Sequence, residues 1–468
     1  MSPEAVNRPA LRTMTTTTAT IAALRSGELQ GITRLDLACD LEEFPREIFE
    51  LADSLEILNL SGNSLTALPD DLSRLGKLRV LFCSENRFSE LPEVLSSCAQ
   101  LEMVGFKANR IGEVAAASIA PGLRWLILTD NQIRALPDAI GVCGRLQKLM
   151  LAGHQLTTLP EAMGGCVGLE LLRISANRFE VLPEWLLQLP RLTWLAFGGN
   201  PVAATPAAPN ADVARLQWRD MELTEKLGEG ASGVIHKAHW QPSPQEDGHA
   251  VTGQPVAVKL FKGAVTSDGF PAAEMAACLA AGNHPNLIGV IGELSGHPEG
   301  SSGLVMPWVE PEFRSLAGPP DLATCTRDIY EDGQRFSLAM VLELAQGLAA
   351  AGEHLHARGI LHGDFYAHNV LYRPAGGCLL GDFGAASFYA PPPSGGSNLF
   401  EALEVRAFGC LLGELLERCD SEQDGRLAVL EALQLRCVGP VAASRPRFAE
   451  LVAELAMLQA RASITKPT

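Results

Sequence analysis

One leucine pattern recurs through the first half of the chain and constrains the possible fold more than any other feature. Its clearest copy starts at Leu55, continues through Leu58 and Leu60, and has Asn63 in the ninth position. Six further copies follow at intervals of 22 or 23 residues. They start at Leu78, Leu101, Leu123, Leu146, Leu169 and Leu192. One copy cannot bury its own leucines, whereas stacked copies share one continuous core, so the pattern predicts a solenoid.

The pattern resembles the leucine-rich repeat family over about residues 32–205, with a shorter copy beginning at Ile32. The resemblance implies an α/β solenoid whose ninth-position side chains form a ladder bonded to backbone groups of neighbouring turns. These side chains are Asn63, Asn86, Asn109, Asn131, Asn177 and Asn200. His154 takes this position in one repeat, and we interpret it as a substitute in the ladder rather than a ligand. Residues 19–31 predict a capping helix after a disordered N-terminus at 1–18.

Strand alternation sends the third and fifth positions of each repeat to the concave face of the solenoid. Those positions carry large apolar side chains: Val80, Phe82, Met103, Trp125, Ile127, Met150, Leu171 and Trp194. An apolar stripe of this kind usually marks a site for a protein partner. The alternative is that another part of the same chain covers it, such as the second domain or the N-terminal tail.

Composition and charge narrow the setting of the chain. A net charge of -17 gives no general attraction to nucleic acid or to an anionic membrane. No apolar run approaches the length of a membrane helix, and the N-terminus has no apolar signal core. The 11 cysteines are scattered without metal-binding spacing, and those within the repeats predict small buried side chains. We expect a cytoplasmic protein, with export by a route that needs no such signal as the alternative.

Residues 206–217 are rich in alanine and proline and predict a linker to a second domain at 218–460. That domain contains a carboxylate at Asp364, an amide five residues later at Asn369, and a second carboxylate at Asp382 in an Asp-Phe-Gly sequence. Phosphoryl transfer from a nucleotide needs such groups. One carboxylate orients the acceptor hydroxyl, while an amide and another carboxylate hold magnesium on the phosphates.

Further motifs lie upstream in a consistent order. A Gly-x-Gly-x-x-Gly sequence at 228–233 is followed by strand-like residues leading to Lys259, and Glu274 follows in a helix-forming stretch. Glycines allow the backbone to approach phosphates that a Cβ would block. His284 begins a turn sequence, and an apolar strand at 304–309 precedes a long apolar helix from 336 to 356.

Together these motifs resemble the protein kinase family, which implies a multidomain chain whose second domain is an α+β, two-lobed fold. The resemblance implies ATP and magnesium as cofactors, Asp364 as the catalytic carboxylate, and Lys259 as the phosphate-binding lysine oriented by Glu274. Asn369 and Asp382 would hold the metal. The remaining nucleotide-binding residues would be Leu227, Gly228, Gly230, Gly233, Ile235, Met306 as the gatekeeper and Val309 in the hinge.

The sequence departs from the family pattern at residues 362–369, which the resemblance makes the catalytic loop, and in the segment after them. Gly363 stands where many protein kinases carry an arginine before the catalytic aspartate, which makes this a non-RD sequence. The activation segment is short, since Ala390 follows Phe383 by only seven residues. We therefore expect no switching by phosphorylation of this segment. Pro392 replaces the usual glutamate, and Tyr366 stands where Ser/Thr kinases place a lysine.

Three functions fit these observations. The first is an active protein kinase, of Ser/Thr type, whose repeats recruit a protein substrate or regulator. The second is a pseudokinase scaffold that binds ATP, which the departures favour and the retained metal-holding groups disfavour. The third is a small-molecule phosphotransferase, because aminoglycoside- and choline-kinase-like enzymes share a His-Gly-Asp sequence with a later asparagine.

Overall fold

The computed structural model describes residues 18–203, 214–230, 232–241, 253–262, 265–266, 268–390, 398–420 and 425–464. The chain divides into two compact units. The first comprises Met1–Met150 and His154–Val167, and the second comprises Leu151–Gly153 and Gly168–Thr468. The division therefore falls inside the repeats, and the last repeats belong to the same compact unit as the second domain.

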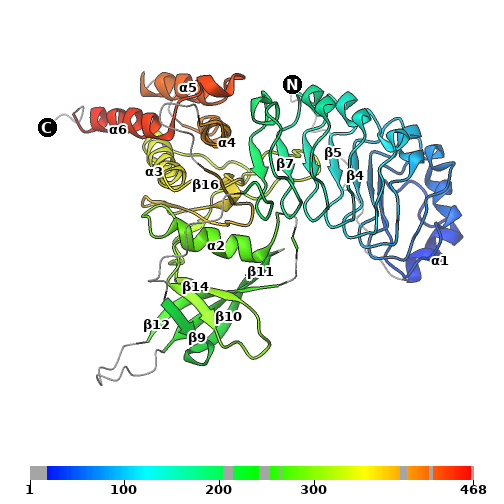
Figure 1. Cartoon of the computed structure of the whole chain (residues 1–468), viewed down its shortest axis with the longest axis horizontal. Helices are drawn as coiled ribbons and strands as arrows, with labels where there is room; N and C mark the ends of the chain where they lie inside the picture. The colour runs from blue at the N-terminus through cyan, green and yellow to red at the C-terminus, as the bar shows by residue number, and fades with distance from the viewer. Residues whose placement is uncertain are drawn as a thin grey trace, which may run out of the picture. The chain divides into compact units, whose positions relative to one another are not determined.

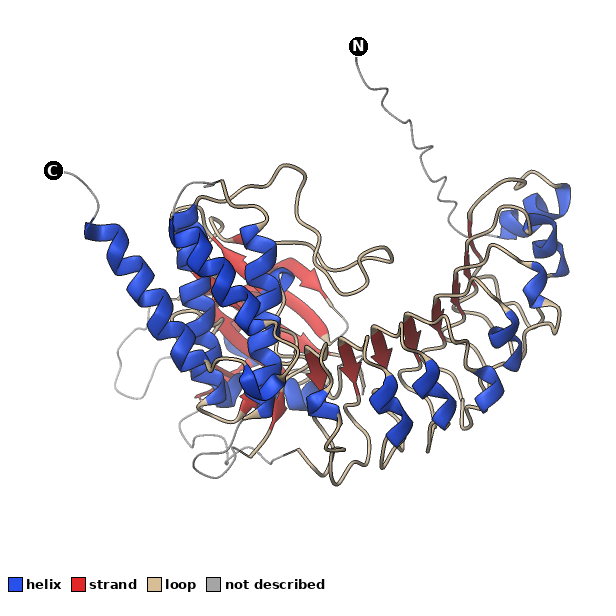
Figure 2. Cartoon of the chain, turned by 90° about the horizontal axis from the view of Figure 1, so that it is seen from above, coloured by secondary structure: helices blue, strands red, loops and turns tan. Residues whose placement is uncertain are grey.

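The first unit is built from short parallel strands, one for each repeat (Figure 2). They are β1 (Arg34–Asp36), β2 (Ile57–Asn59), β3 (Val80–Phe82), β4 (Met103–Gly105), β5 (Trp125–Ile127) and β6 (Lys148–Met150). The middle leucine of β2, Leu58, is fully buried, as are the equivalent residues of its neighbours. The predicted solenoid of stacked repeats is therefore present.

Short 3-10 helices return the chain between these strands. In the first unit they are η1 (Arg46–Leu51), η2 (Leu72–Arg74), η3 (Glu93–Ser97), η4 (Ala116–Ser118), η5 (Asp138–Val142) and η6 (Glu161–Gly165). A proline precedes η1, η3, η5 and η6, and its restricted φ fixes the start of each turn. Helix α1 (Thr18–Ser26) lies at the N-terminal end and is shorter than the expected 19–31, while the expected disordered N-terminus lies almost entirely outside the described residues.

The asparagine ladder satisfies backbone groups of adjacent repeats. Asn86 donates through Nδ2 to the carbonyl oxygens of Leu60 (2.9 Å) and Cys83 (3.1 Å), and its Oδ1 accepts from the Leu65 amide at 2.9 Å. Asn86 thus gives buried backbone groups of two neighbouring turns a hydrogen-bond partner. His154 is buried at the equivalent place in its repeat.

The second unit begins with β7 (Leu171–Arg173) and β8 (Trp194–Ala196), a parallel pair of the last repeats, with η7 (Leu186–Gln188) between them. A six-stranded sheet follows in the order β10-β11-β12-β14-β13-β9. Its strands are β9 (Ala214–Gln217), β10 (Met221–Glu229), β11 (Gly233–Trp240), β12 (Gln254–Phe261), β13 (Gly292–Ser295) and β14 (Gly303–Pro307). Residues 214–217 were expected to be linker, but they form β9 and pair in parallel with β13. The rest of the expected linker, 206–213, lies outside the described residues.

One helix and a small apolar core support this sheet. Helix α2 (Pro271–Ala281) starts with a proline, whose missing N–H costs nothing in the first turn. Val256 and Val258 of β12 pack with Val305 of β14 and Leu294 of β13, all buried. Because β12 is central, the side chains of alternate residues along it reach the opposite face of the sheet, where a cavity lies.

The helical part of the second unit packs around α3 (Leu338–His356), whose buried stripe faces α4 (Leu399–Leu416) and α6 (Phe448–Ile464) (Figure 1). Ser337 caps α3 by accepting from the Met340 amide. The remaining elements are α5 (Gly425–Cys437), β15 (Arg314–Ser315), β16 (Ile360–Leu361), β17 (Val370–Tyr372), β18 (Cys378–Leu380), β19 (Ser387–Phe388), η8 (Trp218–Asp220), η9 (Ala367–Asn369) and η10 (Ala442–Ser444). A six-stranded sheet followed by a helical bundle matches the expected α+β, two-lobed architecture.

No disulfide joins the cysteines of the described residues. Among the described helices, none combines the length and the apolar character that crossing a membrane would need.

Candidate active site

A cavity of about 850 Å³ lies against β10, β11 and β12 of the six-stranded sheet. Every residue that the sequence assigned to nucleotide binding lines it. These are Leu227, Gly228, Gly230, Gly233, Ile235, Lys259, Met306, Val309 and Asp382, together with Glu274. Residues separated by more than 150 positions are therefore brought to one place. The sequence reasoning did not assign Ala257, Leu304 and Leu371, which also line the cavity.

The glycines of the β10–β11 loop serve two different purposes. A Cβ added at Gly228 or Gly230 would meet nothing within 4 Å, so their backbone borders open space that a ligand can enter. A Cβ at Gly233 would lie 2.3 Å from the Leu260 carbonyl oxygen of β12. Gly233 is therefore required for the close approach of two strands, rather than for an approach to phosphate alone.

Lys259 forms a buried ion pair with Glu274 across the cavity wall. The ammonium of Lys259, on β12, contacts Oε1 of Glu274, on α2, and both side chains are almost completely buried. Burial opposes the charge on Lys259, but the carboxylates of Glu274 and Asp382 outweigh it and raise the pKa of the lysine. Lys259 is therefore held as a cation in a water-poor cavity, where its attraction for an anion is strongest.

The catalytic loop holds Asp364 and Asn369 together. Asn369 donates through Nδ2 to both the backbone oxygen and the Oδ2 atom of Asp364, each at 2.9 Å. Its own carbonyl oxygen accepts from the Gly381 amide at 2.9 Å, directly before Asp382. This bond links Asn369 to the residue before Asp382, and Asn369 and Asp382 are the two residues expected to hold the metal. Asp364 and Asn369 are not among the residues that line the cavity.

His362 and Glu404 hold this loop in place through buried hydrogen bonds. His362 is fully buried; one ring nitrogen bonds the Gly381 oxygen at 3.0 Å and the other accepts from the Asp364 amide at 3.3 Å. Glu404 of α4 accepts from the His362 and Gly363 amides at 3.1 and 2.8 Å. Burial disfavours the Glu404 carboxylate, but the hydrogen bond from His356 and the neighbouring charges outweigh it and lower the pKa.

Asp382 adopts a backbone conformation that side chains rarely take, with φ of 55°. Its Oδ1 atom accepts from the Gly384 amide at 3.1 Å, and the next residue, Phe383, is buried with its ring 5.0 Å from the His362 ring. A left-handed conformation at a non-glycine residue costs free energy and persists where the surrounding structure determines it. Here it holds the Asp382 carboxylate at the cavity.

The segment 310–335, which carried no expected function, supports the catalytic loop. Its Asp328 accepts from the His368 amide at 3.0 Å and contacts the His368 ring nitrogen at 2.7 Å. Burial opposes protonation of His368, but Asp328 outweighs it and raises the histidine pKa. Asp328 of this segment thus holds His368, the residue before Asn369, through two contacts.

Residues of the last repeats also reach the catalytic loop. For Trp194 this is the alternative that the sequence left open, whereas no sequence signal indicated it for Arg173. Trp194 was expected on an open partner surface, but its ring stacks on Tyr366 with centroids 4.1 Å apart and is 1% exposed. That expectation was wrong for Trp194, because another part of the same chain covers it. Arg173 contacts Asp364 and Asp268. No motif marks Arg173, since its partner Asp364 lies 191 residues away.

The rest of the predicted apolar stripe is less open than expected. Val80 and Met103 of the first unit are buried, as is Leu171 of the second. Phe82, Trp125, Ile127 and Met150 are half-buried.

Two hydroxyls of the short activation segment are buried. The Ser387 oxygen accepts from the Phe197 amide at 2.9 Å, and the Tyr389 hydroxyl contacts a ring nitrogen of His356 at 2.7 Å. Pro392, which stands in place of the usual glutamate, lies outside the described residues. Arg445, which would pair with such a glutamate, donates instead to the carbonyl oxygens of Ala402, Gly439 and Pro190.

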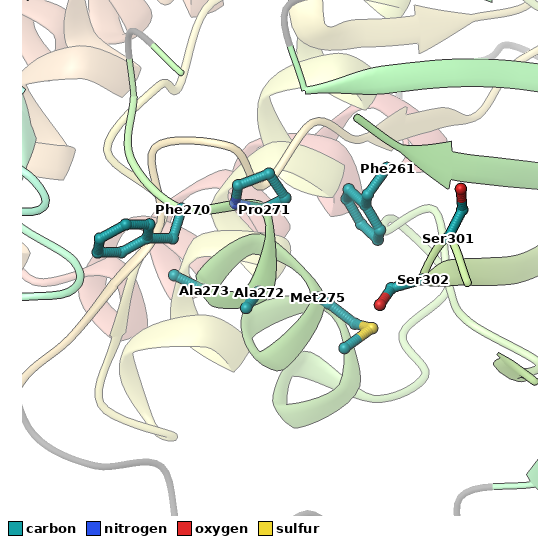
Figure 3. Close-up of a pocket in the computed structure, with 8 residues that line it drawn as sticks. All are labelled: Phe261, Phe270, Pro271, Ala272, Ala273, Met275, Ser301 and Ser302. Carbon is teal, nitrogen blue, oxygen red and sulfur yellow. The ribbon is translucent and has the colours of Figure 1, made fainter. Parts of the chain in front are cut away.

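A second cavity, of about 610 Å³, lies beside the first turns of α2 (Figure 3). Phe261, Phe270, Pro271 and Met275 give it an apolar wall, and Ser301 and Ser302 lie at one end. None of the described residues that line it has an ionisable side chain, so they offer no group for acid–base chemistry.

Among the described residues there is no cluster of three or more His, Cys, Asp or Glu that could hold a metal. At the first cavity, a metal would be held by a smaller set, such as Asn369 and Asp382, completed by a phosphate-bearing ligand.

Comparison with known proteins places two parts of the chain. Residues 221–391 match the family described as protein tyrosine and serine/threonine kinase, and residues 54–75 match the leucine-rich repeat. Similar proteins include cyclin-dependent kinase 11.1 of Caenorhabditis elegans, 30% identical over 42% of this chain and 25% of its own length. A probable serine/threonine-protein kinase of Arabidopsis thaliana is 27% identical over 42% of this chain and 27% of its own.

The serine/threonine-protein kinase PITSLRE of Drosophila melanogaster is 29% identical over 41% of this chain and 19% of its own length. The match thus spans about a quarter or less of these relatives. The family match at 221–391 covers five of the six strands of the sheet, the residues lining the cavity, the catalytic loop and Asp382.

Proposed function

We propose that this chain, which combines leucine-rich repeats with a protein kinase domain, transfers the terminal phosphoryl group of ATP to a protein hydroxyl. The observation that carries the proposal is the buried Lys259–Glu274 pair beside Asp382, next to a loop that holds Asp364 and Asn369. These are the positions that a phosphoryl-transfer site requires, and they occur in one unit.

The cavity residues fit a nucleotide. Leu227, Ile235 and Leu371 supply apolar surface for a base, and the gatekeeper Met306 and the hinge residue Val309 border the same space. Lys259 would bind phosphate oxygens, because it is a buried cation whose orientation Glu274 fixes. When bound, ATP with magnesium supplies the transferable phosphoryl group and neutralises its charge.

The catalytic loop would orient the acceptor. Asp364 would accept the hydrogen bond of the acceptor hydroxyl and take its proton, with Asn369 fixing the carboxylate. Asn369 and Asp382 would hold magnesium, since amide and carboxylate oxygens are suitable ligands. Serine and threonine are the proposed acceptors, because two of the similar proteins are named as serine/threonine kinases.

Activation without phosphorylation of the short segment is part of the proposal. Ser387 and Tyr389 are buried and hydrogen-bonded, so neither hydroxyl is presented to another kinase. The repeats would recruit a protein partner through the half-buried apolar residues of the first unit, Phe82, Trp125, Ile127 and Met150. The scattered spacing of the 11 cysteines supports a reducing compartment such as the cytoplasm.

The test is a transfer assay with labelled ATP, magnesium and a generic protein acceptor. Asp364→Ala should lower kcat by about 100- to 10,000-fold, because it removes the group that receives the proton. Asp382→Asn should lose magnesium-dependent transfer, whereas Lys259→Met should lower the rate by misplacing the phosphates. Asp332→Ala and Lys77→Met, at exposed positions, are the matched controls and should leave the rate unchanged.

The same assay separates the alternatives. ATP binding without transfer by the unmodified chain would support a pseudokinase scaffold and refute the proposal. Transfer to aminoglycosides or choline but to no protein would indicate a small-molecule phosphotransferase. Transfer that persists in Asp364→Ala would show that another group does the chemistry.

A further inference from the structure

The catalytic loop lacks basic side chains at two positions where one would be expected. Gly363 stands directly before Asp364, and Tyr366 follows it by two residues. The second unit nevertheless contains a cation at this place. Arg173, the last residue of β7, donates through Nη1 to the Gly363 carbonyl oxygen at 3.0 Å and through Nη2 to Oδ1 of Asp364. A repeat residue therefore supplies the charge that the loop itself lacks.

Each of the three guanidinium nitrogens of Arg173 donates to an acceptor. Its Nε atom donates to Oδ1 of Asp268 at 2.7 Å, and the whole side chain is 3% exposed. Burial opposes the charge on Arg173, but Asp364 and Asp268 outweigh it and raise the pKa. A guanidinium fixed at three points has little freedom left, so it defines where the Asp364 carboxylate can lie.

The backbones on both sides are shaped for this contact. Gly363 has φ of 73°, and a Cβ there would lie 2.6 Å from the Leu195 carbonyl oxygen of β8. A Cβ at Gly198 would lie 3.0 Å from the Ala386 oxygen, and one at Gly269 would lie 2.9 Å from the Ser175 Cβ. Glycines at three separate points thus allow the last repeats to approach the catalytic loop, the activation segment and the segment before α2 closely.

We propose that Arg173 is a positioning residue for phosphoryl transfer, supplied by the repeats to hold the Asp364 carboxylate in its working orientation. This rests on the proposed function. Arg173 fixes Oδ1 of Asp364, while Asn369 fixes Oδ2 at 2.9 Å. The side chain of Asp364 keeps 19% of its surface exposed, so the carboxylate stays within reach of an acceptor hydroxyl. Asp268, the other partner of Arg173, lines the nucleotide cavity and ties the same guanidinium to that wall.

The experiment compares Arg173→Met, Arg173→Lys, Asp268→Asn and the unmodified chain. Arg173→Met should lower kcat by about 100-fold, since a misplaced catalytic group costs about that much. The dissociation constant for ATP, measured by calorimetry without transfer, should change less than about twofold, which a general loss of structure would not allow. Arg173→Lys should recover part of the rate, because it restores the charge without the fork of donors.

Two controls isolate the contact. Arg178→Met removes an exposed arginine of the same repeat and should leave kcat and the affinity for ATP unchanged. Asp268→Asn weakens the tether but keeps the contact with Asp364, so its loss of rate should be smaller than that of Arg173→Met. If Arg173→Met does not fold, Arg173→Lys and Asp268→Asn take its place. A loss of kcat with unchanged affinity for ATP in these two variants would then support the inference.

The outcomes are distinct. A rate that rises in Arg173→Met would make Arg173 a cap on Asp364 and overturn the inference, as would an unchanged rate. Equal losses of kcat and ATP affinity would show a structural role only and would also overturn it. An unmodified chain that transfers nothing would refute the proposed function, and the positioning role with it.

Discussion

Single buried carboxylates determine where the active-site backbone lies. Glu404 is 1% exposed and receives hydrogen bonds from two consecutive amides, those of His362 and Gly363, and a contact from His356 at 2.8 Å. Without this carboxylate, two buried N–H groups would have no acceptor, because the position is closed to water.

Glu404→Ala should therefore lower the free energy of unfolding by about 3–5 kcal/mol, the cost of leaving buried partners of a charge unsatisfied. Chemical denaturation followed by circular dichroism measures this. Glu431→Ala, on the exposed side of α5, is the matched control and should change the stability by less than about 0.5 kcal/mol. Equal effects of the two substitutions would contradict the role of Glu404.

At this scale the sequence predicted the residues whose spacing along the chain is itself the signal. Asp364, Asn369 and Asp382 lie within 19 residues of one another, and their order defines their chemistry. Arg173 could not be found in this way, because its role depends on a contact between residues 191 positions apart. The insert residue Asp328 was missed for the same reason, since nothing near it in the sequence indicates His368 as a partner.

Among the elements, the repeats follow their sequence pattern most closely. The period fixes both the strand and the ladder, so β1–β6 and the asparagines could be placed before the structure was known. The strand β9 could not, because its four residues are mostly exposed and show no alternation. It forms because β13, about 78 residues further along the chain, offers a free edge.

The ladder position of His154 predicts acid sensitivity of its repeat. Burial lowers the pKa of His154 from 6.5 to about 4, so the unfolded chain takes up a proton at a higher pH than the folded one. Stability is then complete above pH 6.5 and is lost as the pH falls towards 4, by roughly 3 kcal/mol.

His154→Asn should remove this part of the acid sensitivity, because asparagine does not titrate and fits the ladder. Urea unfolding at pH 7 and at pH 5 measures the difference. Thr157→Asn, at an exposed position of the same repeat, adds no titrating group and should leave the pH dependence as it is. A pH profile that is identical in His154→Asn and in the unmodified chain would show that His154 is not titrated on unfolding.

For the whole molecule, the repeat and kinase halves suggested by the sequence do not coincide with its compact units. The second unit extends back to Gly168 and so includes the strands β7 and β8. Motifs revealed the two kinds of domain, but the boundary depends on tertiary contacts such as the Trp194–Tyr366 stack, which pattern alone does not indicate.

Trp194→Ala should loosen the catalytic loop as well as its own repeat. The Trp194 ring is buried and its Nε1 atom donates to the Phe365 oxygen at 3.3 Å, so its loss leaves a large void beside the loop. We expect a loss of about 3–5 kcal/mol in stability and faster hydrogen exchange over residues 362–369. Trp125→Ala, in the first unit, should not change exchange in that segment. Equal protection of the loop in both variants would refute the contact.

The bare backbone at Gly363 limits which substitutions that position can take. The Leu195 and Ala385 carbonyl oxygens occupy the space where any side chain at that residue would begin. An arginine introduced at 363 could fit only if β8 moved away from the loop. Control of the loop through a basic residue at 363 is therefore incompatible with the packing of the last repeats seen here.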